Sequence, residues 1–181
     1  MSQPTTTLAK IKAAGPCQDR WRYALHNPAV KKIRADTPIT VRQIVETVGL
    51  NDALWCLRAM PGHDDKWRLF AVSCARRVQH LMTDPRSVAA LDVAERYALG
   101  QATDEELAAA RAAASDGSSD GSSDAARAAA SDATWAAAWA ASDAVWAAAW
   151  AAAWAARAAA SDAEREWQAA ELIRICEEIE P

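Results

Sequence analysis

The chain has 181 residues, which suits one domain of ordinary size with or without an extended appendage. Alanine dominates, while there are only 6 Gly, 2 Tyr and 1 Phe, so residues typical of strands are scarce and we expect an all-α fold without a sheet. A formal net charge of −4 is too mild for a protein that coats nucleic acid or imitates it, which argues against nucleic acid as a partner.

The cysteines and the apolar runs predict a cytoplasmic protein. The 4 cysteines, Cys17, Cys56, Cys74 and Cys176, are far apart without a CxxC pair, and the first residues, MSQPTTTLAK, form no apolar secretion segment. The longest uncharged apolar run of the alanine tract, residues 144–156, has 13 residues. That is well short of the ~20 that span a bilayer, so we expect no membrane partner.

The first part of the chain predicts two short helices and a connector. Thr7 is placed to cap a helix that ends at Gly15, and QDRWRYALH, residues 18–26, is a second helix that Asn27 and Pro28 stop. Residues 28–36 carry three cations without a helical period, and we interpret them as a solvated connector rather than a phosphate site: Lys31, Lys32 and Arg34.

Two further helices form a hairpin in the sequence. Thr37 and Pro38 resemble a cap and a first-turn proline, opening a helix through Val48, and Asn51 is placed to cap the next, residues 52–60. The outline resembles a helix-turn-helix. The second helix starts Asn-Asp-Ala and continues with apolar residues rather than with base-reading side chains, which favours a packed hairpin over DNA binding.

The clearest amphipathic helix outside the alanine tract starts at Asp64 or Asp65. Its apolar residues recur at i, i+3, i+4 and i+7, which predicts a core position: Trp67, Phe70, Ala71, Cys74, Ala75, Val78, Leu81 and Met82. Asp84 with Pro85 opens another helix that ends by Gly100. Thr103 with Glu106 forms a capping box for the next, so short turns predict antiparallel neighbours.

Three regions follow from this pattern: a helical bundle over residues 1–114, a Gly/Ser/Asp linker over 115–124, and a long helix over 125–181. The linker's spaced aspartates lack the acid pattern and closing glutamate of a calcium loop. The long helix is expected to run from Asp124 to about Glu178, packed on the bundle or on a second copy, with a break near Ser161 as the alternative.

The long helix carries a tryptophan face. Five indoles fall within an arc of about 100° and the opposite side is alanine, in a tract whose eleven-residue units ASDATWAAAWA and ASDAVWAAAWA nearly repeat. Two aspartates lie one turn before indoles, and an arginine lies one turn after the last indole. These charged residues favour a half-covered face that binds a partner over a buried one. Core packing and self-association stay open as alternatives. The candidate residues are Trp135, Trp139, Trp146, Trp150, Trp154, Asp132, Asp143 and Arg157.

No pattern for catalysis, a metal or a cofactor is present. His26, His63 and His80 are isolated in the sequence, without the i, i+4 partner of a metal site. The serines lack a nucleophile elbow, and there is no glycine-rich phosphate loop. We therefore expect no enzyme, no catalytic residues, no metal and no cofactor.

Four motifs outside the linker are distinctive: GLNDALWCLRAM, WRLFAVSCARRVQHLM, LDVAERYALGQATDEELAAAR and AEREWQAAELIRI. Together with the alanine and tryptophan tract, they resemble a group of bacteriophage and prophage proteins. From Trp67 onward the chain is also similar to all-helical proteins assigned as immunity proteins of polymorphic toxin systems, although AVSCARR has one cysteine and two arginines where those proteins have an acidic residue between two cysteines. The resemblance implies a helical inhibitor without catalytic residues.

The leading hypothesis is therefore a non-enzymatic helical binding protein of phage or prophage origin. It would inhibit or neutralise a host-defence or toxin protein in the cytoplasm of the bacterial host. The alternative is a self-assembling structural or scaffold helix, in line with a homodimer through the long helix. An ice-binding alanine-rich helix is the weaker alternative, because indoles interrupt the flat array of small residues that such a surface favours.

Overall fold

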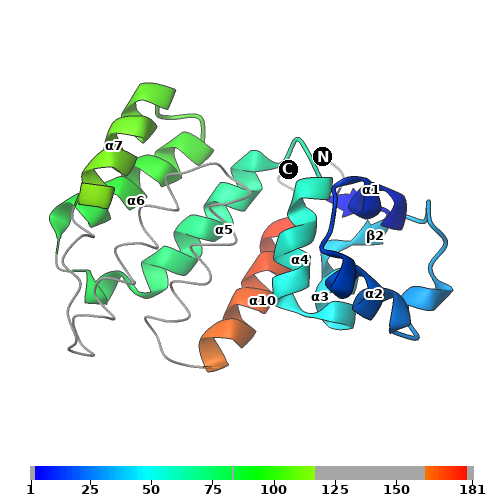
Figure 1. Cartoon of the computed structure of the whole chain (residues 1–181). Coiled ribbons are helices and arrows are strands. Elements are labelled where there is room, and N and C mark those ends of the chain that lie inside the picture. The colour runs from blue at the N-terminus through cyan, green and yellow to red at the C-terminus, as the bar shows by residue number, and fades with distance from the viewer. Residues whose placement is uncertain (1–2, 83, 117–161, 179–181) are drawn as a thin grey trace. The chain divides into compact units, whose positions relative to one another are not determined.

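The computed structural model describes residues 3–82, 84–116 and 162–178, and nearly all of its regular structure is helical (Figure 1). The expected all-α character is confirmed at this level. The chain divides into two compact units. We call Met1–His63 with Ala169–Pro181 the N-terminal unit and Asp64–Gln168 the central unit. The division falls inside the bundle expected over residues 1–114.

The N-terminal unit consists of short elements. It contains the strands β1 (Thr5–Thr6) and β2 (Ile39–Thr40), the helices α1 (Leu8–Ala13), α2 (Gln18–His26), α3 (Val41–Val48) and α4 (Leu50–Cys56), and the 3-10 helices η1 (Val30–Lys32) and η2 (Leu57–Ala59). The last turns of α10 (Asp162–Glu177) complete it. Thr7 caps α1 as expected, since its hydroxyl accepts from the Lys10 N–H at 3.2 Å.

The expectation of no sheet is wrong at one place. β1 and β2 pair antiparallel, with Thr5 opposite Thr40 and Thr6 opposite Ile39. Thr6 is buried and its hydroxyl donates to the Ala59 carbonyl at 3.0 Å, which ties the ribbon to η2. Strands of two residues are too short to show the alternation by which a sequence marks a strand, so their pairing depends on the tertiary fold.

The start of α3 also differs from the expectation. The helix begins at Val41 rather than after Thr37, because Ile39–Thr40 is extended in β2. Thr40 forms the cap instead: its hydroxyl accepts from the Gln43 N–H at 3.2 Å, and the Gln43 side chain accepts from the Thr40 N–H at 3.0 Å. This is a complete capping box.

Two other elements differ from the sequence-based expectation, one in its bounds and one in its structure. The helix expected over residues 52–60 begins earlier, at Leu50, ends at Cys56 and gives way to η2. The expected connector, residues 28–36, contains η1, and Val30 within it is buried. A single turn of 3-10 helix has no apolar period of its own, so only packing reveals it.

The central unit contains α5 (Asp64–Arg77), η3 (Gln79–Leu81), α6 (Pro85–Ala98), α7 (Asp104–Asp116) and the first turns of α10. α5 is shorter than the predicted helix, which reached Met82. The predicted caps are confirmed: Asp84 accepts from the Arg86 N–H at 2.8 Å, and Glu106 accepts from the Thr103 N–H at 2.8 Å. That backbone bond to Thr103 lowers the pKa of Glu106.

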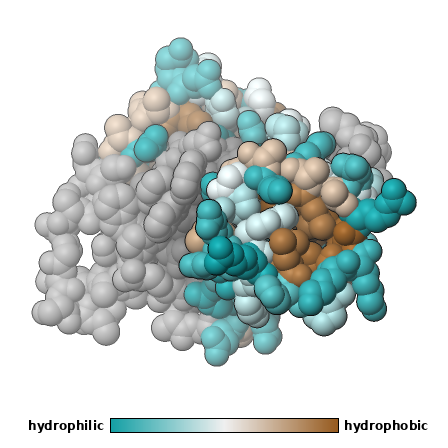
Figure 2. Space-filling view, turned by 45° about the vertical axis from the view of Figure 1, so that its right-hand side comes forward, coloured by the Kyte–Doolittle hydropathy of each residue, from teal (hydrophilic) through white to brown (hydrophobic). Residues whose placement is uncertain are grey.

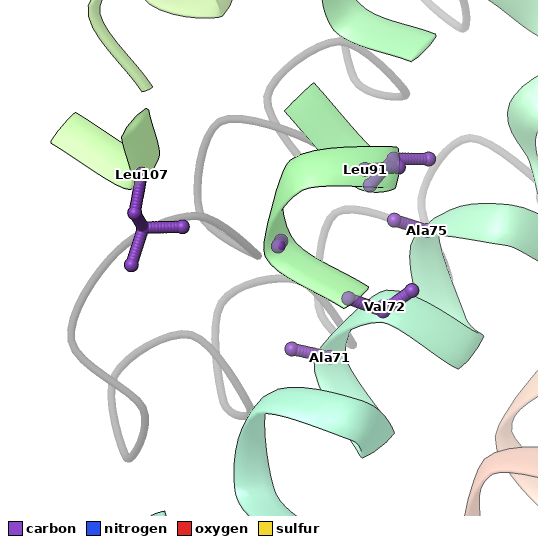
Figure 3. Packing of buried hydrophobic residues seen from close by; sticks show 6 residues of the cluster. Ala71, Val72, Ala75, Leu91 and Leu107 are labelled. Carbon is purple, nitrogen blue, oxygen red and sulfur yellow. The ribbon is translucent and has the colours of Figure 1, made fainter. Parts of the chain in front are cut away.

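The core of the central unit lies between α5, α6 and α7. Its stripe on α5 is confirmed, since Trp67, Phe70 and Cys74 are fully buried. Figure 3 shows Leu91 of α6 lying beside Ala75 of α5, within a cluster that also contains Ala71, Val72, Ala94 and Leu107. Where α6 faces α7, the buried pair is Ala90 and Ala114. Small side chains let those two helices approach closely.

α10 is the described part of the expected long helix. Leu172 and Ile175, predicted to lie on an apolar stripe, are buried together with Cys176. At its C-terminal end, Arg42 of α3 donates two hydrogen bonds to the Glu177 carboxylate, both at 2.6 Å. The rest of the expected long helix, residues 125–161, and the linker beyond Asp116 lie outside the described residues, so those expectations stay predictions.

Candidate binding pocket

A pocket of about 190 Å³ lies in the N-terminal unit. We call it the N-terminal pocket. Its walls come from α1, α2, η1, α3 and α4 and from the residues next to them, and the lining side chains are Leu8, Ile11, Pro16, Cys17, Arg20, Trp21, Ala24, Val30, Ile33, Ile39, Gln43, Ile44, Thr47, Val48, Asn51, Asp52, Trp55 and Cys56. Most of them are apolar. Figure 2 shows a hydrophobic surface patch with a hydrophilic border on the side that carries α1, α2 and β2 in Figure 1.

Helix α2 forms one wall of the pocket. Trp21 and Ala24 line it together with Cys17, the residue just before the helix, at the i, i+4 and i+7 spacing of an amphipathic stripe. No residue of α2 is buried, and Trp21 and Ala24 are only half-buried. Because the cavity lies under this face, the apolar stripe of α2 is left partly uncovered instead of being packed into the core.

Two polar contacts tie α2 to the rest of the unit. At its start, Arg20 Nε donates to Asp52 Oδ1 of α4 at 3.2 Å, and Arg20 Nη2 donates to Asp52 Oδ2. The hydrogen bond to Asp52 raises the pKa of Arg20. At its end, Asn27 Nδ2 donates to the carbonyl of Thr47 in α3 at 2.9 Å. The pocket therefore lies under a helix that is held at both ends by hydrogen bonds.

α4 supplies an oriented aromatic side chain to the opposite wall. Arg58 lies over the Trp55 ring, with its guanidinium carbon 4.4 Å from the ring centroid, and Arg58 Nε donates to the Trp55 carbonyl at 3.0 Å. Next to it, burial raises the pKa of Cys56 to about 12, so this thiol stays protonated at neutral pH. The contacts of Arg58 fix Trp55, which is only partly buried.

The chemistry of the pocket suits an apolar group. Cavities of about 150 Å³ lined by aliphatic and aromatic side chains bind a ring the size of benzene, so about 190 Å³ is enough for one apolar side chain. The residues that the structure describes contain no cluster of three or more His, Cys, Asp or Glu able to hold a metal ion. In the same part of the chain, no helix is both long and apolar enough to cross a bilayer.

The central unit contains a second cluster of charged and aromatic side chains. Arg77 Nε donates to Glu164 Oε2 at 2.8 Å, and its guanidinium carbon is 4.5 Å from the centroid of the Trp167 ring. Gln168 Nε2 donates to the other Glu164 oxygen at 3.2 Å. Glu164 and Gln168 are buried, so this cluster attaches the start of α10 to α5 and is structural.

The sequence predicts a different candidate surface. Its residues, Trp135, Trp139, Trp146, Trp150, Trp154, Asp132, Asp143 and Arg157, all lie outside the described residues, so the tryptophan face stays a prediction. The N-terminal pocket was missed because its walls come from five separate short segments. The available signal was the i, i+4, i+7 stripe of Cys17, Trp21 and Ala24, which the sequence pattern does not distinguish from ordinary core packing.

Comparison with protein-family models, with curated proteins and with solved structures gave no match for this chain.

Proposed function

We propose that this chain is a non-enzymatic binding protein that captures a protein partner, with the N-terminal pocket as one of its contact sites. The resemblance to phage and prophage proteins supports a partner that belongs to a host-defence or toxin system, which the chain inhibits by occupying it. No catalytic residue is proposed.

The observation that carries this proposal is the uncovered apolar wall of α2. A free-standing helix gains most of its stability from packing, yet α2 buries none of its residues and lies over a cavity. Two half-buried indoles, Trp21 and Trp55, line that cavity. Tryptophan is the residue most enriched among interface hot spots, and partner side chains commonly fill such apolar pockets.

The tryptophan face of the expected long helix is the second surface in this proposal. Its indoles between Trp135 and Trp154 would provide an apolar ladder with Asp132, Asp143 and Arg157 to fix the register. The same face supports the alternative function, a self-assembling helix that forms a dimer. Light scattering at tens of micromolar, where micromolar dissociation constants become visible, distinguishes the two, because a strict monomer contradicts self-assembly.

The proposal is tested by filling the pocket. Ala24→Trp places an indole in the cavity from a half-buried position. The tagged wild-type protein, Ala24→Trp and Leu99→Trp are compared in pull-downs from the bacterial host. Leu99 is 50% exposed and directly follows α6 in the central unit, so its change is the matched control.

We expect at least one protein to be captured by the wild type and by Leu99→Trp but not by Ala24→Trp. That protein is then purified and its activity measured with and without the chain, and inhibition is expected. Identical captures by all three proteins, with unchanged helicity, would contradict a role for the pocket.

A further inference from the structure

We propose that the N-terminal pocket binds an acidic amphipathic helix. The apolar face of that helix enters the pocket, and its Asp and Glu residues pair with exposed Lys and Arg residues of the pocket-forming segments. The inference rests on the proposed function and adds the chemistry of the partner segment. It follows from the distribution of charge in the chain and from the segments that form the pocket walls.

Charge is strongly unequal along the chain. Residues 1–63 contain 9 Lys and Arg against 4 Asp and Glu, a net +5, whereas residues 64–181 contain 11 against 20, a net −9. Residues 169–181, with 1 against 4, bring the N-terminal unit as a whole to a net +2. The mild total of −4 hides this asymmetry. Such an asymmetry favours an acidic partner for the basic segment.

The basic residues of the N-terminal unit include a group that the fold does not neutralise. Arg20 and Arg42 are ion-paired with Asp52 and Glu177. Five other cations are exposed and make no ion pair with any residue that the structure describes: Lys10, Lys12, Lys31, Lys32 and Arg34. We call these five side chains the basic rim.

The basic rim belongs to the same two segments that form pocket walls. Lys10 and Lys12 lie on α1, whose Leu8 and Ile11 line the pocket. In the second segment the lining residues are Val30 and Ile33. Lys31 and Lys32 lie between them, and Arg34 directly follows Ile33.

A backbone hydrogen bond places these two segments next to each other. The Ala9 N–H donates to the Ala35 carbonyl at 3.0 Å, so the first turn of α1 lies beside the residue that follows Arg34. The two segments that carry the five cations therefore lie side by side, and both contribute residues to the wall of the same apolar cavity.

An amphipathic helix satisfies both features at once. Such helices bind grooves by apolar side chains at i, i+3, i+4 and i+7, and their flanking charges set orientation and association rate. The phosphate backbone of a nucleic acid would pair with the cations but leave the apolar cavity empty. The basic rim is also mainly Lys, whereas Arg is the residue that binds phosphate with two parallel hydrogen bonds. The observations therefore favour an acidic protein segment over nucleic acid.

The test uses fluorescein-labelled synthetic peptides of about 18 residues, or five helical turns. One peptide carries Leu and Phe on one face and Glu on the other, and its matched partner has Lys in place of every Glu. Binding to the full-length chain is measured by fluorescence anisotropy at low and high salt, because rim charges are screened as ionic strength rises.

The decisive variants are Lys31→Glu with Lys32→Glu, and their matched control Arg111→Glu with Arg165→Glu. Arg111 and Arg165 are exposed residues of the central unit, so both double variants change the net charge equally. We expect the acidic peptide to bind at least ~10-fold more weakly to the first variant and about equally to the second and to the wild type. Ala24→Trp is expected to abolish binding. Circular dichroism checks that each variant keeps its helicity.

Three outcomes would overturn the inference. The Lys-containing peptide could bind as tightly as the acidic one. The two double variants could weaken binding equally. Phosphatidylglycerol vesicles or single-stranded DNA could bind more tightly than the acidic peptide and lose binding with Lys31→Glu and Lys32→Glu, which would assign the rim to a lipid surface or to nucleic acid.

Failure of this inference is distinguishable from failure of the proposed function. If a host protein is lost with Ala24→Trp but its binding is insensitive to salt and to the Lys31 and Lys32 changes, protein capture stands and the acidic helix is wrong. If no captured protein depends on the pocket, the proposed function fails whatever the peptides do.

Discussion

Arg20 and Asp52 form a paired contact that links α2 to α4 at the wall of the N-terminal pocket: Arg20 Nε donates to Asp52 Oδ1 at 3.2 Å, and Nη2 donates to Oδ2. Both residues line the cavity, so the contact is part of the cavity wall. It holds a helix that has no buried residue of its own.

The first prediction concerns this contact. Asp52→Asn removes the charge with little change in shape, so α2 should open more often, while global stability changes little because the Arg20 side chain is 56% exposed. Hydrogen exchange of residues 18–26 measures the opening, and faster exchange is expected. Asp19→Asn is the control, because among the residues that the structure describes Asp19 pairs only with Arg22 of the same helix, at 3.9 Å. Unchanged exchange in Asp52→Asn would show that the pair does not hold the helix.

The second prediction concerns the cysteines. Cys17 is exposed, whereas Cys56, Cys74 and Cys176 are buried. In the native protein at about pH 8, iodoacetamide should therefore modify Cys17 and leave the other three until the protein is unfolded. Peptide mass spectrometry gives the position of each label. Rapid labelling of Cys56 would contradict its burial in the native protein.

Cys56 also predicts a loss of stability at alkaline pH. Burial raises its pKa from the ordinary 9.0 to about 12, so above pH 9 the unfolded chain loses this proton while the folded chain keeps it. The free energy of unfolding should fall between about pH 9 and 12, by up to ~1.4 kcal/mol per pH unit. Urea titrations of Cys56→Ala should show a shallower fall than the wild type, and parallel curves would exclude this cause.

The third prediction concerns the core between α5 and α6. Leu91 is fully buried beside Ala75, so Leu91→Ala should lower the free energy of unfolding by about 2–5 kcal/mol through lost contacts and a cavity. Leu99→Ala is the matched control on the same chain segment, since Leu99 is 50% exposed and should change stability by less than about 0.5 kcal/mol. Equal effects in urea unfolding would place Leu91 outside the core.

The fourth prediction is an asymmetry within one ion pair. Glu164 is 3% exposed while its partner Arg77 is 44% exposed. Arg77→Gln leaves a buried carboxylate without its cation. Glu164→Gln leaves an arginine that is still hydrated and still lies over the Trp167 ring. We therefore expect Arg77→Gln to be the more destabilising by about 1–2 kcal/mol. Thermal unfolding of both variants measures this, and the reverse order would contradict the described burial.

The fifth prediction tests the tryptophan face. Changing Trp146 and Trp150 to Ala together should abolish partner capture but leave helicity and melting temperature nearly unchanged, because alanine is at least as good a helix former. Pull-down and circular dichroism are measured on the same preparation. A collapse of the melting temperature, as expected for emptied core sites, would assign these indoles to the core instead.

Much of the local structure follows from the sequence alone. The caps Thr7, Asp84 and Thr103 were predictable because each cap is formed with the next two or three residues of the chain. The α5 stripe was predictable too, since a helical period of 3.6 residues places Trp67, Phe70 and Cys74 on one face wherever the helix packs. These features depend on a few consecutive turns.

Only the tertiary structure decided the features that join distant segments. The pairing of Thr6 with Ile39 moved the start of α3 to Val41, because residues held in a strand cannot also begin a helix. The N-terminal pocket combines side chains from Leu8 to Cys56, each unremarkable in its own segment. Whether an apolar stripe such as that of α2 is packed or left over a cavity depends on what lies opposite it, and a local pattern of residues contains no information about that partner.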